Sequence, residues 1–278
     1  MLDILVKNPF LLRAILGLFL ASFASATMGT FTMLRGISFL TAEVAHAALG
    51  GAALGIFLQS IGLIGDLDPF YIALIFSITT ALFTGYAGEK ESIRMETAIG
   101  VSFAISMSIA VTLMGMIPSE KLPKIWGYLI GDILLLTYND LQILFLVTLI
   151  VVITTTIFCR EFAYISFDIE GAESMGLNVK LYQYLMLFLA ALAIVTATKT
   201  IGSILVYAFM IAPSAIAAEI ASSVPGIMII SLLISIICGL IGLKLSLILN
   251  IAPSGLIGLI LSITYLVVTM IIKTIKKH

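Results

Sequence analysis

Glu43 and His46 lie three residues apart in the apolar stretch EVAHAALGG, which runs from residue 43 to residue 51. Residues three or four apart share one face of a helix, so a helical segment would bring this carboxylate and this imidazole together. Imidazole is the commonest transition-metal ligand, and carboxylate oxygen supports it. The pair therefore predicts a partial, weak metal site of the kind that a passing ion requires. A buried histidine that hydrogen-bonds a neighbouring helix is the alternative.

Small residues accompany this pair at a four-residue spacing, at Ala47, Gly51 and Gly55. Such a ladder lets helix backbones approach each other closely within a membrane. Ionisable groups inside a membrane bundle face its interior or an aqueous cavity, because exposure to hydrocarbon is costly. We therefore expect the face that carries Glu43 and His46 to pack against other helices and not against lipid.

The composition is that of a membrane protein. The 278 residues are 61% hydrophobic and 10% charged, with a mean hydropathy of +1.23, whereas soluble domains are about half apolar and about a quarter charged. We expect a single transmembrane domain over residues 1–278, surrounded by lipid in the cell (inner or plasma) membrane. The net charge of −1 and the lack of a long basic run argue against nucleic acid as a partner.

Nine apolar segments are long enough to cross a bilayer, which takes about 20 residues. They are continuously apolar, which predicts helices and not the alternating strands of a membrane β-barrel. The fold class is therefore expected to be all-α, a polytopic bundle of about eight to nine transmembrane helices. The expected spans are 12–34, 40–64, 70–88, 95–117, 140–158, 182–200, 202–221, 226–248 and 253–272.

The distribution of Lys and Arg predicts the orientation of the bundle. If the tail Lys273–Lys277 is cytoplasmic, Arg35, Lys90–Arg94 and Arg160–Lys180 lie on the same side. Against the rule, the outer side then receives four basic residues, which are Lys7, Arg13, Lys121 and Lys124. The segment Trp126–Leu134 is too short to cross the membrane and carries aromatic residues, so we expect a short interfacial or re-entrant helix on the outer side.

The tripeptide Ala-Pro-Ser occurs twice, at residues 212–214 and 252–254. Proline inside a span opens the helical hydrogen-bond ladder, and broken helices line the substrate paths of many transporters. Proline is also favoured in the first turn of a helix. A packing kink, a helix start and a substrate contact all remain open for these two positions.

The longest cytoplasmic loop is predicted to contain a helix of about two turns at 168–176. Asp168 can cap its start, and Gly176 can adopt the left-handed conformation that ends it. Glu170 and Glu173 favour the positive end of the helix. Its apolar face is expected to comprise Ile169, Ala172 and Met175. So short a helix is unstable alone, so it must dock on this chain's own helix ends or in a groove of a partner.

The chain carries no motif for nucleotide hydrolysis, zinc proteolysis or serine hydrolysis, because G-x-x-x-x-G-K-[ST], H-E-x-x-H and G-x-S-x-G are all missing. We therefore expect no enzyme. If the chain moves a solute uphill by nucleotide hydrolysis, another subunit must supply the energy. Cys159 and Cys238 are isolated in apolar runs, which is typical of inert buried thiols.

Four groups of motifs occur in one order along the chain. They are Leu34–Ser38 with Glu43–Ala47 and Gly51–Gly55, then Arg94–Gly100, then Ser166–Ala172 with Gly176–Leu177, and last Gly202–Leu205 with Ala212–Ala217. In these motifs the chain resembles the membrane permease subunit of metal-ion ABC importers, the zinc, manganese and iron type. The likeness extends from about residue 10 to residue 272.

This resemblance implies an architecture and a set of partners. The permease would be a homodimer around a central path, and an extracytoplasmic metal-binding protein would deliver a divalent ion of zinc, manganese or iron. No cofactor would be bound permanently. The helix at 168–176 would be the coupling helix that inserts into a cytoplasmic ATPase. Its contact residues would be Asp168, Ile169, Glu170, Gly171, Ala172, Met175 and Gly176.

The chain departs from the family pattern at the metal motif. The family usually has Gly-Asp ahead of the histidine, with Asp four residues before it, whereas here these positions hold Thr41 and Ala42. Glu43 lies one residue later and still falls near the face of His46, so it is expected to replace the missing carboxylate. An altered site or a different ion is the alternative. Two other functions also remain open, namely an ABC permease for a metal chelate or another small solute, and a proton-coupled secondary transporter that uses Glu43 and His46 as a relay.

Overall fold

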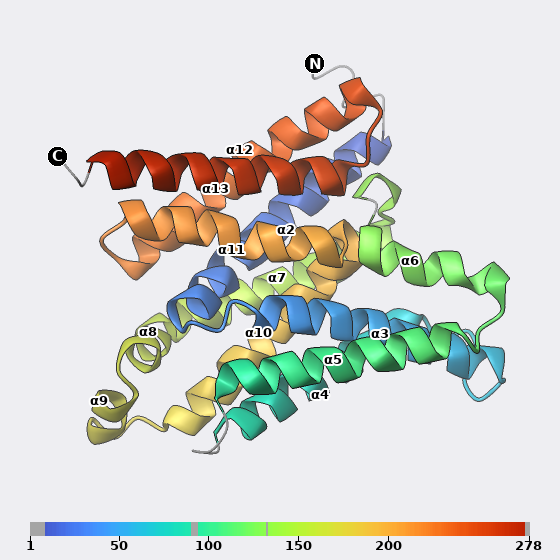
Figure 1. Cartoon of the computed structure of the whole chain (residues 1–278), viewed down its shortest axis with the longest axis horizontal. Coiled ribbons are helices and arrows are strands. Elements are labelled where there is room, and N and C mark those ends of the chain that lie inside the picture. Colours follow the sequence, from blue (N-terminus) through green and yellow to red (C-terminus); the bar gives the residue numbers. More distant parts are fainter. Residues whose placement is uncertain (1–8, 90–93, 132, 276–278) are drawn as a thin grey trace.

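The computed structural model describes residues 9–89, 94–131 and 133–275, and these residues form helices without a strand (Figure 1). The long helices are α2 (Pro9–Leu34), α3 (Leu40–Ser60), α4 (Pro69–Gly88), α5 (Met95–Met114), α7 (Tyr138–Ile157), α10 (Val179–Ile201), α11 (Ser203–Ile220), α12 (Val224–Leu249) and α13 (Pro253–Ile275). The short elements are η1 (Ser119–Lys121), α6 (Leu122–Ile130), η2 (Ile133–Leu135), α8 (Cys159–Phe167) and α9 (Ile169–Ser174).

The long helices confirm the predicted membrane bundle. Within the described residues, nine helices are long and apolar enough to cross a membrane. Each overlaps one of the nine segments expected from hydropathy, and only Gly202 separates α10 from α11. Some residues of the orientation prediction lie outside the described residues, namely Lys7, 90–93 and 276–278, as does Asp132 of the predicted outer segment.

Local sequence signals explain where several helices begin. The Asp68 side chain accepts a hydrogen bond from the Phe70 amide, and Pro69 occupies the first turn of α4. Of the two Ala-Pro-Ser copies, the structure places Pro213 inside α11 and Pro253 at the start of α13. One is therefore a proline within a span, and the other is a helix start.

The bundle has central and peripheral helices. In α3 and α10, 83% and 72% of the most apolar window is buried, whereas in α13 only 11% is buried. Figure 1 shows α8 and α9 together at one end of the bundle and α6 at the opposite end. We call the first the coupling end and the second the outer end. Arg35 hydrogen-bonds α8, so the α2–α3 turn also lies at the coupling end.

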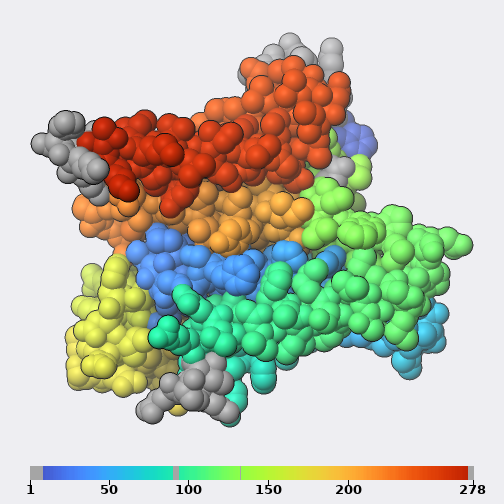
Figure 2. Space-filling model, viewed as in Figure 1, coloured from blue at the N-terminus to red at the C-terminus, as the bar shows by residue number. Residues whose placement is uncertain are grey.

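The space-filling view shows the molecule hollowed between α6 and the α12–α13 hairpin at the outer end (Figure 2). A groove lies there between α6 and the beginning of α13, and its lining includes Trp126, Ile130 and Pro253. Trp126 is half exposed. An exposed aromatic side chain on a short helix at the end of a membrane bundle is typical of the membrane–water interface, which agrees with the interfacial position expected for this segment.

The small residues of α3 lie in its contacts with neighbouring helices. Ala47 is fully buried. A methyl group added to Gly51 would lie 2.6 Å from the Cα atom of Ala73 in α4, and one added to Gly55 would lie 3.1 Å from the Cα atom of Pro69. The ladder therefore faces α4, and glycine lets the two backbones touch.

Gly51→Ala is expected to destabilise the protein, because the new methyl group must push α3 away from α4. Inserting one methyl group into a packed contact costs about 1–3 kcal/mol. Gly100 in α5 is the matched control, because a methyl group added there meets nothing within 4 Å. Gly100→Ala should raise stability slightly, since alanine is the better helix former. Thermal unfolding in detergent measures both, and equal midpoint shifts for the two variants would contradict this packing.

Candidate metal site and coupling helix

Glu43 lies in the first turn of α3 and is fully buried. The Thr84 hydroxyl in α4 donates a hydrogen bond to Glu43 Oε1. The Ser102 hydroxyl in α5 lies 2.8 Å from Thr84 Oγ1. Because Thr84 has a single proton, which it gives to the carboxylate, Ser102 is the donor in the second bond. Glu43 thus heads a chain of polar groups that joins three helices.

The second carboxylate oxygen of Glu43, Oε2, differs from Oε1 in its hydrogen bonding. Oε2 is buried and has no hydrogen-bond partner within the described residues. An ionised carboxylate in such a place carries a desolvation cost of several kcal/mol unless a cation compensates it. Glu43 Oε2 is therefore an available acceptor for a cation or a proton in the interior of the bundle.

His46 lies one turn further along α3 and is half-buried. Its Nδ1 atom is 2.8 Å from the carbonyl oxygen of Ala42. A carbonyl oxygen can only accept, so Nδ1 carries the proton and, in the neutral ring, Nε2 carries the lone pair. Metal-ligating histidines commonly use their other ring nitrogen in this way. The imidazole also packs edge-on against Phe103 of α5, with 4.9 Å between ring centroids.

The two candidate ligands are bonded to different partners. No hydrogen bond or ion pair joins Glu43 to His46 in the described part of the chain, and no group of three His, Cys, Asp or Glu residues gathers there. His46 contacts Phe103 of α5, whereas Glu43 is linked to Ser102 of α5 only through Thr84. Both residues lie in the first two turns of α3, near the coupling end.

The predicted short helix is present as α9. Asp168 caps its start, because the Asp168 carboxylate accepts a hydrogen bond from the Gly171 amide at 2.9 Å. Gly176 has a φ of +82° and follows the last turn. The Leu177 amide donates to the Ala172 carbonyl oxygen at 3.1 Å, a backbone bond typical of a helix that ends in a left-handed glycine.

The predicted apolar face of this helix is divided between two environments. Ala172 is fully buried against the chain itself, whereas 46% of Ile169 and 57% of Met175 is exposed. Beside the helix lies a groove whose lining includes Tyr164, Phe167 and Met175. The chain's own packing therefore covers one of the three apolar residues and leaves two large ones free for contact.

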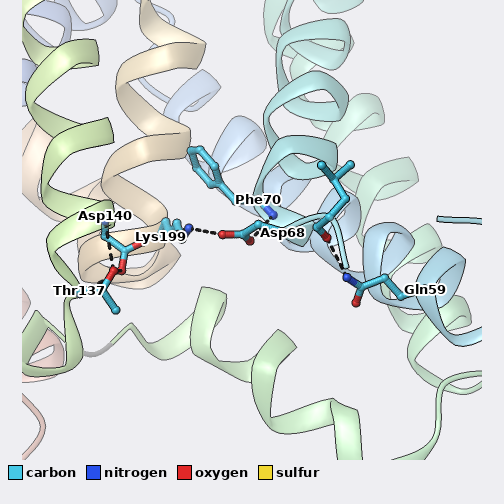
Figure 3. Close-up of polar contacts among 7 residues, drawn as sticks. Gln59, Asp68, Phe70, Thr137, Asp140 and Lys199 are labelled. Carbon is cyan, nitrogen blue, oxygen red and sulfur yellow. Dashed lines mark hydrogen bonds and ion pairs between the residues drawn. The ribbon is translucent and has the colours of Figure 1, made fainter. Parts of the chain in front are cut away.

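A cluster at the outer end joins three helices, and it was not predicted from the sequence. Lys199 Nζ lies 2.9 Å from Asp68 Oδ2 and 3.0 Å from Asp140 Oδ1 (Figure 3). It also lies 4.5 Å from the centroid of the Phe70 ring. The Asp140 carboxylate also accepts from the backbone amide and hydroxyl of Thr137, at the start of α7. Lys199 thus fastens the end of α10 to the beginnings of α4 and α7.

The individual signals for this cluster were present in the sequence. Asp68 precedes a proline, Asp140 follows Thr137 by three residues, and Lys199 ends an apolar span. Each pattern indicates a helix end. The pairing itself depends on how distant helices pack, since 131 residues separate Asp68 from Lys199.

Lys199→Met is expected to lower the free energy of unfolding by roughly 2–3 kcal/mol, because it leaves two carboxylates near each other without their partly buried cation. The matched control is Lys180→Met. Lys180 lies 3.8 Å from Glu89 and its side chain is 77% exposed, so its loss should cost less than about 1 kcal/mol. Chemical or thermal unfolding in detergent compares the two. A Lys199 variant as stable as the Lys180 variant would show that the cluster does not hold the helices together.

Two glycines also meet at the outer end, where α6 and α10 both stop. Gly131 has φ 66° and ψ 149°, and Gly202 has φ 82° and ψ 154°, a combination essentially confined to glycine. A methyl group on Gly202 would collide with the Ile130 carbonyl group, and one on Gly131 would collide with the Ile201 carbonyl group and the Gly202 nitrogen. The break between α10 and α11 therefore fits directly against the end of α6.

Comparison with known proteins identifies the family. A family model described as the ABC 3 transport family matches residues 7–272. The manganese transport system membrane protein MntC of Listeria monocytogenes is 29% identical over 266 residues, which cover 96% of this chain and 92% of that protein. The manganese import system permease protein ScaB of Streptococcus parasanguinis is 29% identical over 266 residues, with the same shares covered.

A solved structure has the same fold. In PsaBC from Streptococcus pneumoniae in complex with Fab, the matching chain is 28% identical with a TM-score of 0.82, over 96% of this chain and 93% of that chain. The expected resemblance to metal-ion ABC permeases is thereby confirmed. Since the family model spans nearly the whole sequence and nine helices among the described residues are long and apolar enough to cross a membrane, the chain belongs to the ABC 3 transport family and is a multi-pass membrane permease.

Proposed function

We propose that this chain is the membrane subunit of an ATP-driven importer for a divalent metal cation, most directly manganese, and that a separate ATPase subunit supplies the energy. The observation that carries the proposal is a combination of two features. The short helix α9 is capped and exposes apolar side chains at one end of the bundle, and the central helix α3 carries an imidazole and a carboxylate. Two relatives with manganese in their names support the choice of ion. Zinc and iron are the alternative cargoes, because imidazole and carboxylate suit all three.

In the proposed site, His46 binds the ion through Nε2, and its Nδ1–H bond to Ala42 holds the ring in place. Glu43 supplies charge through Oε2, which has no other partner within the described residues. Manganese takes about six ligands, so one imidazole and one carboxylate make a weak, incomplete site. Such a site lets the ion leave again. The fully buried position of Glu43 means that α4 or α5 must shift before the ion reaches this carboxylate.

The remaining ligands are proposed to come from water, from backbone carbonyls or from a second copy of the chain. His46 is half-buried in a single copy, so its ring is accessible from outside this bundle. We therefore retain the homodimer around a central path as part of the proposal. The whole chain, residues 1–278, would act as one permease domain, and an extracytoplasmic metal-binding protein would deliver the ion at the outer end.

The coupling step is proposed to occur at α9. Its two exposed apolar side chains, Ile169 and Met175, would enter a groove of the ATPase, since a helix this short needs a surface to pack on. Asp168, Glu170 and Glu173 add negative charge beside them. When the ATPase subunits close on ATP, they displace α9, and the helices around His46 open to the opposite side of the membrane.

Met175→Asp tests this proposal, and it is expected to abolish co-purification with the cognate ATPase while the permease stays folded. The substitution places a charge where an apolar contact is proposed, and Met175 packs little within its own chain, with 57% of its surface exposed. Met116→Asp is the matched control, because this methionine is 61% exposed and lies two residues beyond the end of α5, far along the chain from α9. Retention of the ATPase by the Met175 variant, or its loss from both variants, would argue against coupling through α9.

A further inference from the structure

Arg35 lies in the turn between α2 and α3 and reaches two other parts of the chain. Its Nη1 atom donates to the carbonyl oxygen of Ile165 in α8. Its Nη2 atom donates to Gln183 Oε1 at the beginning of α10, at 2.7 Å. These residues are 130 and 148 positions away in the sequence, so one guanidinium joins three separate segments at the coupling end.

The α8 helix that Arg35 contacts is rigidly seated. Phe162 is fully buried and packs against Phe31 of α2, with 5.5 Å between ring centroids. Phe158 and Phe162 also contact Tyr182 of α10, at 5.7 and 6.4 Å. Aromatic pairs of this kind stabilise a fixed arrangement. The α8 helix is thus expected to move together with the end of α2 and the beginning of α10.

Short hydrogen-bonded connections link α8 to α9 and the α2–α3 turn to α3. On one side, the Asp168 amide donates to the Tyr164 carbonyl oxygen at 2.9 Å, and Asp168 then caps α9. On the other side, the Leu40 amide donates to the Ile37 carbonyl oxygen at 2.9 Å, where α3 begins. Arg35 is therefore five residues ahead of α3, the helix with Glu43 and His46. It is also hydrogen-bonded to α8, the helix that directly precedes α9.

The chemistry of this contact favours a mechanical function. The Arg35 side chain is half-buried, and burial lowers the pKa of its guanidinium. Both acceptors that the structure gives it are neutral, a carbonyl and an amide oxygen. Hydrogen bonds from a charged donor are stronger than neutral ones, so this guanidinium fixes the relative position of the segments that it joins. It forms directional bonds that hold two segments in register and can still separate.

We propose that Arg35 is a positioning residue that transmits displacement of the coupling helix to the start of α3 and so to His46. This inference rests on the proposed function, in which an ATPase moves α9. When α9 and α8 are displaced, the Ile165 carbonyl group pulls on the guanidinium and the α2–α3 turn follows. The bond to Gln183 keeps the beginning of α10 in the same movement, so the two central helices shift together.

The test uses the permease with its ATPase, reconstituted in vesicles, and measures both ATP hydrolysed and radiolabelled manganese imported. Arg35→Ala is expected to lower the manganese imported per ATP about tenfold or more, since it removes two bonds from a charged donor. ATP hydrolysis and ATPase binding should stay within about twofold of wild type, because α9 itself is intact. Arg35→Lys keeps a cation that can reach one acceptor and should restore part of the ratio.

Arg94→Ala is the matched control, because Arg94 precedes α5, is exposed, and makes no side-chain cap bond. It should leave the manganese imported per ATP unchanged. If Arg35→Ala does not fold, Gln183→Ala replaces it, since it removes one of the two acceptors and is expected to lower the same ratio by a smaller factor.

The outcomes separate the inference from the function on which it rests. A wild-type complex that hydrolyses ATP without importing manganese, zinc or iron would overturn the proposed function, and with it the coupling through Arg35. A wild-type complex that imports metal, together with Arg35 and Gln183 variants of unchanged ratio, would overturn only the inference on Arg35. A lowered ratio in the Arg94 control as well would also overturn it, because the effect would then be common to any arginine at this end.

Discussion

Replacing His46 by alanine is expected to lower manganese uptake by about 100-fold or more while the complex with the ATPase still assembles. The imidazole is the strongest candidate ligand in the chain, and its Nδ1–H bond to the Ala42 carbonyl leaves Nε2 free to coordinate. Even the loss of a group that only supports a metal ligand costs about 10–100-fold in affinity or activity. Uptake of radiolabelled manganese into vesicles that contain the reconstituted complex measures the effect.

Gln59→Ala provides the control for this prediction. Gln59 lies on the same helix but at its outer end, where its amide donates to the Leu67 carbonyl oxygen at 2.7 Å. Loss of this partly exposed bond should change stability by about 1 kcal/mol and leave most of the uptake intact. Normal uptake by the His46 variant would remove His46 from the ion path. Loss of uptake together with loss of the bound ATPase would also contradict the prediction, because His46 would then be needed for assembly.

Replacing Gly202 by alanine is expected to prevent normal folding or to lower the unfolding midpoint strongly. The backbone conformation at Gly202 is essentially confined to glycine, and an alanine there carries a strain of about 1–3 kcal/mol. The added methyl group would also collide with the Ile130 carbonyl group. The end of α6 would have to leave the break between α10 and α11. Yield of monodisperse protein in detergent and its thermal midpoint measure the change.

Gly62 is the comparison glycine for this prediction. It also has a positive φ, of +75°, but a methyl group added there meets nothing within 4 Å. Gly62→Ala reports the cost of a positive φ at the end of a helix without a steric contact, and the additional loss in Gly202→Ala reports the contact with α6 together with the extended ψ of 154° at Gly202. Equal losses in the two variants would show that this contact does not contribute to stability.

The helical bundle was predictable because a membrane span requires a long apolar helix, which is visible in the sequence of that segment alone. In hydrocarbon each span must satisfy its own backbone hydrogen bonds, so length and hydropathy identify a helix without knowledge of its neighbours. All nine spans were located in this way. The ends of α9 were predictable for a similar reason, because Asp168 and Gly176 act on residues beside them in the chain.

The candidate site was predictable only in part. Spacing placed Glu43 and His46 on one helix, which the structure shows as α3, but it could not show that they are bonded to different partners. Thr84, which binds Glu43, comes from another helix 41 residues away. The cluster around Lys199 was missed for the same reason, since a single side chain has no periodicity that points to its partners. Contacts between helices depend on packing, which the pattern of one segment does not contain.

The central claim is that ATP hydrolysis by a partner subunit drives a divalent metal ion through this chain. Its most direct measurement is uptake of radiolabelled manganese into vesicles that contain the permease and its ATPase, with ATP on the ATPase side and a protonophore present. We expect uptake that requires ATP, persists without a proton gradient and is reduced by competing divalent cations. Uptake that continues without ATP and stops when the proton gradient collapses would contradict the claim and would identify a proton-coupled carrier instead.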